Sequence, residues 1–96
     1  MTNVVISSAA EDDYTQSLTW YAERNVDAAN DFDAEFDRAL SQIAAKPELF
    51  PHCDARHRYF LLRRFPFRII YRMIDDDIVV IAVAHSSRSP DYWTNR

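Results

Sequence analysis

The sequence predicts a single α+β domain: an N-terminal strand, a two-helix antiparallel hairpin, then a three-stranded antiparallel meander, with the helices packed on one face of the sheet. Apolar residues in the first half recur at helical spacing, whereas those in the second half alternate or run continuously, as in strands. Only Arg24-Asn25-Val26 separates the two helical stretches, which places the helices side by side. Because 96 residues hold one core, we treat residues 1–96 as one domain.

The first strand and helix are predicted from residues 4–25. Val4-Val5-Ile6 is a short apolar run, and Ser7-Ser8 after it can cap a helix. Glu11 stands three residues after Ser8, which is the spacing of a capping box. Apolar residues then share one helical face until the helix ends near residues 23–25, namely Ala10, Tyr14, Leu18 and Tyr21. We interpret this stripe as core, with Trp20 at its margin and able to dock a partner.

The second helix is predicted from about Asp27 to Lys46, with Pro47 as the stop. Its apolar stripe predicts the main contact with the sheet and consists of Ala29, Phe32, Phe36, Ala39, Leu40 and Ile43. Acidic residues fall mostly on the other sides and are interpreted as a solvated face: Asp31, Asp33, Glu35 and Asp37. Residues 47–57 are expected to form a loop.

Three strands are predicted over residues 59–63, 67–74 and 78–84. Pro66 marks the first turn, and the run of aspartates at 75–77 forms the second in the absence of glycine. Alternation in the middle strand puts Phe67, Ile69, Tyr71 and Met73 on one face, and Arg68, Ile70 and Arg72 on the other. The last strand is apolar on both faces and should be central. The pattern leaves open where the first strand joins the sheet.

Composition excludes several function classes. The chain has no glycine, so it holds neither a glycine-rich phosphate loop nor a dinucleotide fingerprint, and we expect no cofactor. No apolar run reaches the roughly 18 residues of a membrane span, and residues 1–6 do not resemble a signal peptide. We therefore expect a cytoplasmic protein without a membrane partner. The single Cys53 cannot form an internal disulfide, which fits a reducing compartment.

Charge is distributed unevenly within the net value of −4. Residues 1–55 hold three Lys and Arg against eleven Asp and Glu, whereas residues 56–96 hold eight Arg against four Asp. Arginine suits planar contacts to phosphate and carboxylate. The basic half therefore predicts an anionic partner, either a nucleic acid or an acidic peptide. The alternative is that these charges only keep the strand edges soluble.

A candidate catalytic group follows the last strand: His85, Arg88 and Tyr92. These residue types can exchange a proton, stabilise a developing phosphate charge, and donate a proton or stack on a base. With Arg64, Arg68 or Arg72 nearby they could cleave RNA without a metal. The alternative is that His85 holds the strand end while Tyr92-Trp93 cover the sheet edge as a hydrophobic lid.

A metal site is not expected. His52, Cys53 and His57 do not follow a standard zinc spacing, and a fourth ligand is missing. Cys53 is an equally weak candidate nucleophile, because its loop position is its only recommendation.

Four features resemble the RelE/ParE superfamily of type II toxin–antitoxin toxins, ParE-like branch, whose members are often called plasmid stabilisation proteins. They are the order of elements, Ala28-Ala29 opening the second helix, the loop at residues 46–51, and the segment Arg64-Phe65-Pro66-Phe67-Arg68-Ile69-Ile70-Tyr71-Arg72. The end of the chain is similar to a His-x-x-Arg-x-Pro-x-Tyr-Trp close, here His85 to Trp93. Ser86 and Asp91 stand where relatives often have glycine, which puts the loop geometry in question.

The resemblance implies a bacterial growth-inhibiting toxin that a cognate antitoxin, encoded next to it, wraps and neutralises. ParE-type members poison DNA gyrase, whereas RelE-type members cleave mRNA on the ribosome. In the RelE case Arg64 or Arg68 would hold phosphate, Arg88 would stabilise the transition state, and His85 or Tyr92 would move the proton. The acidic net charge and the single Lys46 favour the ParE type. A toxin fold retained only as a binding partner is a third interpretation.

The predicted target contacts are Arg64, Arg68 and Arg72. The predicted antitoxin contacts are Trp20, Arg63, Arg68 and Arg72, because a basic and partly apolar surface suits an acidic amphipathic peptide.

Overall fold

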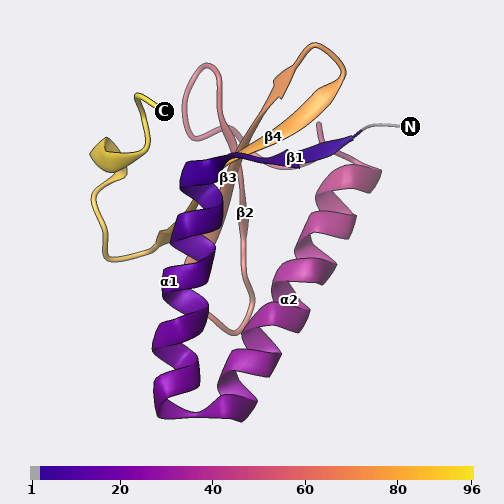
Figure 1. Cartoon of the computed structure of the whole chain (residues 1–96). Coiled ribbons are helices and arrows are strands. Elements are labelled where there is room, and N and C mark those ends of the chain that lie inside the picture. Colours follow the sequence, from indigo (N-terminus) through magenta and orange to yellow (C-terminus); the bar gives the residue numbers. More distant parts are fainter. Residues whose placement is uncertain (1–2) are drawn as a thin grey trace.

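The computed structural model describes residues 3–96, in which a helical hairpin covers one face of a four-stranded sheet (Figure 1). The elements in chain order are β1 (Val4–Ile6), α1 (Ser8–Arg24), α2 (Val26–Ala45), β2 (Arg58–Leu61), β3 (Phe67–Ile74), β4 (Asp77–His85) and the short 3-10 helix η1 (Pro90–Tyr92). The strands lie in the order β1-β4-β3-β2. The predicted α+β class and order of elements are confirmed.

The strand order of the sheet shows where the first strand joins it. β1 runs parallel to β4, with Val4 opposite Ile78 and Ile6 opposite Val80, while β4, β3 and β2 form the predicted antiparallel meander. The Ser7 N–H still donates to the Val80 carbonyl at 3.1 Å, and the chain then turns into α1. No strand of the described chain therefore pairs with this edge of β4 beyond Val80.

A β-bulge lies in β4 just past that point. Ile70 of β3 pairs with Ala82, but Tyr71 pairs with Val80, so Ile81 has no partner residue on β3. The extra residue shifts the alternation of side chains along β4. As a result β4 contributes apolar side chains to both faces of the sheet, as a central strand should.

The larger core lies between the helices and the sheet. Phe32 of α2 is at its centre, with its ring 5.2 Å from Phe67 and 5.3 Å from Phe65, centroid to centroid. The predicted stripe of α2 is buried here except for the partly exposed Leu40. The α1 stripe behaves differently. Only Ala10 of that stripe is fully buried, whereas Tyr14, Leu18 and Tyr21 pack at the edge of the core.

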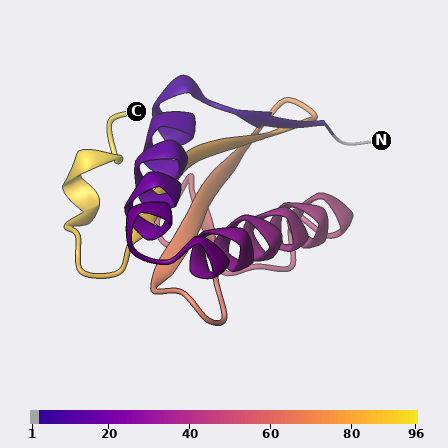
Figure 2. The ribbon, with the colours of Figure 1, turned by 60° about the horizontal axis from the view of Figure 1, so that its bottom comes forward.

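A smaller core lies on the opposite face of the sheet, and the C-terminal tail covers it. Trp93 is 5% exposed and packs with Ile70, Ile81 and Ala82. Its indole also meets the buried imidazole of His57 edge-on, with centroids 5.2 Å apart. Figure 2 shows α1 between α2 and this tail. Trp93 therefore forms a hydrophobic lid, but it lies over the face of the inner strands β3 and β4 rather than over the sheet edge.

Asp13 of α1 ties the tail to the bulge. Its carboxylate accepts the Val83 N–H at 3.1 Å and two bonds from the Arg96 guanidinium, at 2.7 and 3.2 Å. Arg96 also donates to the Ile81 carbonyl at 3.1 Å. The two side chains thus satisfy backbone groups of β4 that no strand of the described residues reaches.

Three sequence-based details were wrong. Ser7, not Ser8, caps α1, because its Oγ accepts the Ala10 N–H at 3.1 Å, and this leaves Glu11 outside a capping box. Strand β2 ends at Leu61 rather than at residue 63. Glu35, expected on the solvated face of α2, is only 6% exposed. The turn after β3 is as expected, with Asp75 at φ 55°, a conformation that Asp tolerates better than most residues.

We predict that Asp13→Asn lowers the free energy of unfolding by about 2 kcal/mol, because Arg96 and the bulge lose a buried charged acceptor. Urea unfolding followed by circular dichroism measures this. The matched control is Asp12→Asn, which changes the exposed neighbour in the same turn and should shift stability by less than about 0.5 kcal/mol. Equal effects of the two variants would contradict this role for Asp13.

Candidate functional site

His85 lies at the end of β4, on the helix side of the sheet. It pairs with Phe67 across the ladder, and the two rings meet edge-on with centroids 5.1 Å apart. Its Nδ1 accepts the Ser87 N–H at 3.1 Å and lies 2.7 Å from Ser87 Oγ. The imidazole therefore stabilises the turn that follows β4 while its exposed edge stays on the side of α1.

Arg88 and Tyr92 contact each other in the tail. The Arg88 guanidinium stacks on the Tyr92 ring at 3.7 Å, and the Arg96 guanidinium lies 4.9 Å from the same ring. Burial and the negative charge of Asp13 raise the pKa of the Tyr92 phenol, and the positive charges of Arg88 and Arg96 lower it by less. The phenol is therefore protonated at neutral pH. Tyr92 packs against the smaller core, on the face opposite His85. The three residues do not meet at one point.

The predicted phosphate-binding arginines are also divided. Arg68 and Arg72 both extend from the face of β3 that bears the smaller core, where the Arg68 guanidinium lies 5.0 Å from the Tyr59 ring. Arg72 borders a pocket of about 320 Å³ with Arg56 and Arg58. Arg64 lies elsewhere, in the loop between β2 and β3, and its guanidinium binds carboxylates of α2.

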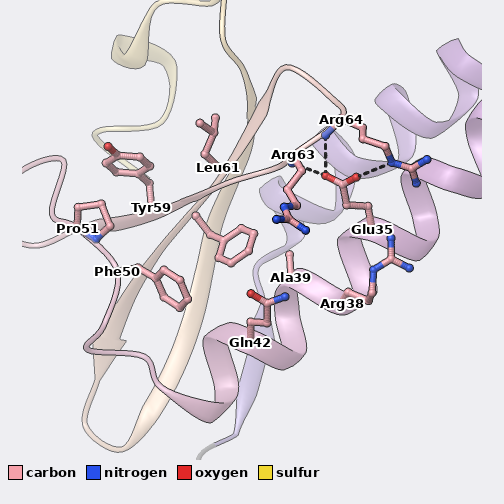
Figure 3. A pocket seen from close by; sticks show the side chains of 11 residues that line it. Glu35, Arg38, Ala39, Gln42, Phe50, Pro51, Tyr59, Leu61, Arg63 and Arg64 are labelled. Carbon is pink, nitrogen blue, oxygen red and sulfur yellow. Dashed lines mark hydrogen bonds and ion pairs between the residues drawn. The ribbon is translucent and has the colours of Figure 1, made fainter.

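The largest described hollow is a groove of about 1040 Å³ between α2 and β2 (Figure 3). Apolar side chains form much of its lining, and they are Ala39, Phe50, Pro51, Phe60 and Leu61. Three arginines border it, namely Arg38 on α2 and Arg63 and Arg64 on the β2–β3 loop. Figure 3 shows the Arg63 side chain pointing into the space between the strand and the helix.

Glu35 holds this loop in place. Its carboxylate accepts the N–H groups of Arg63 and Arg64, the latter at 3.2 Å, and the Arg64 Nε at 3.3 Å. Burial alone would raise the pKa of this carboxyl, but the backbone and guanidinium donors together hold it below its ordinary value. Arg64 is thereby paired with an acidic residue. Arg38 and Arg63 make no ion pair within residues 3–96.

A second, smaller cleft of about 560 Å³ lies between α1 and the sheet, beside His85. Trp20 borders it and is 52% exposed, with the Arg24 guanidinium stacked 3.9 Å from its ring. The four predicted antitoxin contacts thus occupy three places. Trp20 lies at this cleft, Arg63 at the α2–β2 groove, and Arg68 and Arg72 on the face that bears the smaller core.

His57 and Cys53, in the loop at residues 47–57, have surroundings that suit a structural role. His57 is buried under Trp93, with its Nδ1 2.9 Å from the Asp54 carboxylate. Burial first, and then the charge of Asp54, raise the pKa of the exposed Cys53 thiol, which disfavours the thiolate. Within residues 3–96 no three His, Cys, Asp or Glu side chains gather as metal ligands, and no helix there is long and apolar enough to cross a membrane.

Sequence reasoning missed the polar residues that organise these places, which are Asp13, Glu35, Arg38 and Arg96. For two of them the helical spacing in the sequence indicated burial. Glu35 stands three residues after Phe32 and four before Ala39, and Asp13 stands three after Ala10, so both carboxylates fall on buried helical stripes. Arg38 and Arg96 carry no such pattern.

Two solved structures share the fold of this chain. The fold superposes with a TM-score of 0.78 on a chain of the chromosomal ParDE toxin–antitoxin system from P. aeruginosa, at 15% identity over 88% of this chain and 96% of that chain. It superposes on the isolated E. coli RelE toxin with a TM-score of 0.63, at 15% identity over 96% and 92% of the two chains. The chain therefore shares its fold with both of these proteins.

The family follows from the sequence. The family model described as ParE toxin of type II toxin-antitoxin system, parDE, matches residues 4–90, so the chain belongs to the ParE toxin family. A curated relative is Toxin ParE2 of Mycobacterium tuberculosis, found in strains CDC 1551 and H37Rv. It is 25% identical over 87 residues, which cover 90% of this chain and 83% of the relative. The resemblance drawn from the sequence is confirmed.

We predict that Glu35→Gln destabilises the protein by about 1 kcal/mol at pH 7, because a neutral acceptor replaces a charged one. The folded-state pKa of Glu35 lies below its unfolded value, so its contribution is complete above about pH 4.3 and is lost as pH falls through the folded pKa. The difference in the free energy of unfolding between wild type and variant should therefore disappear at acidic pH. Urea unfolding at pH 7 and pH 3 measures it.

The control for this pH dependence is Glu23→Gln, which makes the same exchange at an exposed position near the end of α1. Its effect should be small at both pH values. A gap between wild type and Glu35→Gln that stays constant down to pH 3 would contradict the role of the charge.

Proposed function

We propose that this ParE-family toxin inhibits growth by binding DNA gyrase, without chemistry of its own, and that an antitoxin encoded next to it neutralises it. The observation that carries the proposal is the separation of His85 from Tyr92. The imidazole lies on the helix side of the sheet and accepts a hydrogen bond from Ser87, whereas Tyr92 packs on the other face, where the Arg88 and Arg96 guanidinium groups contact its ring. This arrangement favours a target that is bound over one that is cleaved, because a general acid and a general base act together on one phosphate.

The charge of the chain supports the same target. A protein that works on ribosomal RNA needs a strongly cationic surface. This chain has a net charge of −4, and the carboxylates of α2 bind Arg64, one of its basic residues. Binding to a protein target is more compatible with this balance than binding to a polyanion.

Neutralisation by an antitoxin is supported by the α2–β2 groove. It combines an apolar lining with Arg38 and Arg63, which make no ion pair within the described residues. An acidic amphipathic segment would bury apolar side chains there and place its carboxylates beside the two guanidinium groups.

The gyrase proposal predicts that micromolar purified toxin inhibits supercoiling of plasmid DNA by gyrase, or accumulates the cleaved DNA complex. Addition of the antitoxin before gyrase should restore supercoiling. Toxin that slows growth on induction, yet has no effect in either gyrase assay, would contradict the proposed target. Induction that leaves growth untouched would favour a toxin fold kept only as a binding partner.

The second candidate is a ribosome-dependent mRNA endonuclease. Arg68, Arg72 and Tyr92 share the face that bears the smaller core, and this favours it. In that case primer extension after induction should show codon-linked cuts in mRNA.

We predict instead that His85→Ala and Arg88→Ala each keep full toxicity, since neither side chain performs chemistry in the gyrase proposal. Growth curves after induction measure toxicity, with immunoblots to confirm equal protein levels. Loss of toxicity in both variants, together with mRNA cuts that disappear in both, would replace the gyrase proposal with the endonuclease.

A further inference from the structure

A small basic pocket lies between the loop at residues 47–57 and the end of β3. Its volume is about 320 Å³, and Arg56, Arg58 and Arg72 are among the residues that line it. We propose that this pocket binds a single phosphate group. The site lies outside the α2–β2 groove and is independent of the target proposed above.

The end of β3 presents an unpaired backbone donor on the side of this pocket. The Leu62 N–H donates to the Phe67 carbonyl at 3.0 Å, which marks a hydrogen-bonded pair of the antiparallel ladder. Such pairs recur at every second residue, and Arg58 with Tyr71 is the last of them, because β2 begins at Arg58. The next such position on β3 is Met73, which lines the pocket. Its N–H points away from β4 and forms no hydrogen bond within residues 3–96.

The loop at residues 47–57 is held firmly against this end of the sheet. The Arg58 Nη1 donates to the Phe50 carbonyl at 2.6 Å and to the Glu48 carbonyl at 3.1 Å. The Tyr71 hydroxyl donates to the Pro47 carbonyl at 2.6 Å. The Arg58 guanidinium is therefore fixed at the pocket by one nitrogen, while its other donors bond no group of the described chain.

Arg72 reaches the pocket from the opposite face of the sheet. Arg58 shares a face with its cross-strand partner Tyr71, so the next residue of β3 extends from the other face. Arg72 forms no ion pair within residues 3–96, and its Nε is buried there without a hydrogen-bond partner. Its guanidinium thus has no acceptor in the described chain that would compete with a ligand.

The acidic side chains nearby do not neutralise the three arginines. The Asp54 carboxylate accepts the N–H groups of Arg56 and His57 at 2.8 and 2.7 Å, and it lies 2.9 Å from the His57 Nδ1. It is therefore used by its own loop. Glu48 borders the pocket but forms no ion pair within residues 3–96. Three guanidinium groups thus face one carboxylate.

The arrangement of the donors favours phosphate over carboxylate. Arginine binds both anions, but the oxygens of a carboxylate lie in one plane, whereas those of a phosphate group point in several directions. Here the donors come from both faces of β3, from the loop and from the Met73 backbone. The pocket is also near the lower end of the roughly 300–1,000 Å³ of typical ligand sites. The phosphate can belong to a nucleic acid backbone or to a free phosphate ester, because both present the same oxygens.

Amide NMR spectra of the wild-type protein test the site without any variant. Titration with inorganic phosphate, at an ionic strength held constant with sodium chloride, should shift the Met73 N–H and the Arg72 Nε–H resonances until the shifts saturate. Sodium chloride alone should not reproduce these shifts. A Met73 amide that does not respond to phosphate would overturn the proposal.

Two neutral variants test the arginines. Arg72→Gln and Arg56→Gln should each weaken phosphate binding by about tenfold, because each removes a charged and bidentate donor. Arg56 is exposed in the loop, so its exchange does not endanger the fold. The matched control is Arg24→Gln, which removes one charge at the end of α1, outside the pocket, and should leave the affinity unchanged. Equal affinities of all three variants would overturn the pocket as the site.

A comparison of two ligands identifies the source of the phosphate. A short DNA duplex and adenosine monophosphate are titrated at equal phosphate concentrations, and the Met73 N–H shift is followed. A tighter response to the duplex would assign the site to a nucleic acid backbone, and a tighter response to the nucleotide would assign it to a free phosphate ester. A response to neither ligand would overturn the proposal. These measurements use the toxin alone, so their outcome is separate from that of the gyrase assays.

Discussion

The carboxylate of Asp13 connects three parts of the chain that are distant in sequence. It joins α1 to the bulge of β4 through the Val83 N–H, and to the C-terminal tail through Arg96. Much of the arrangement depends on this contact. Strand β1 ends too early to pair with the second half of β4, so α1 and the tail must satisfy the free backbone groups there. The same contact keeps Trp93 over the smaller core.

The two carboxylates on the buried helical stripes have comparable roles on the two helices. Asp13 fixes the tail, and Glu35 fixes the loop between β2 and β3. Each neutralises one arginine and orders backbone at the same time. The basic half of the sequence is therefore not one uniform surface. Arg64 and Arg96 are structural, whereas Arg38 and Arg63 form no ion pair with an acidic residue within residues 3–96.

The fold was predictable from sequence to the extent that apolar periodicity determines it. The stripe of α2 and the two-sided apolar run of β4 place the hairpin and the central strand. The position of β1 was not predictable, because three apolar residues fit either edge of a sheet. The bulge at Ile81 was also not predictable from the sequence, since a continuous apolar run shows no break in the alternation of side chains. The bulge helps decide on which face His85 lies, and the site could not be assembled correctly without it.

The tail has a consequence for how the protein is made. The contact between Asp13 and Arg96 spans 83 positions of the sequence, so it forms only after the ribosome has released Arg96 from its exit tunnel. Until that contact forms, Ile70, Ile81 and Ala82 lack the indole that covers them. Such non-local contacts are slow to form, and uncovered apolar surface attracts other chains. Folding thus passes through an interval in which this face of the sheet is open, and the finished domain covers it.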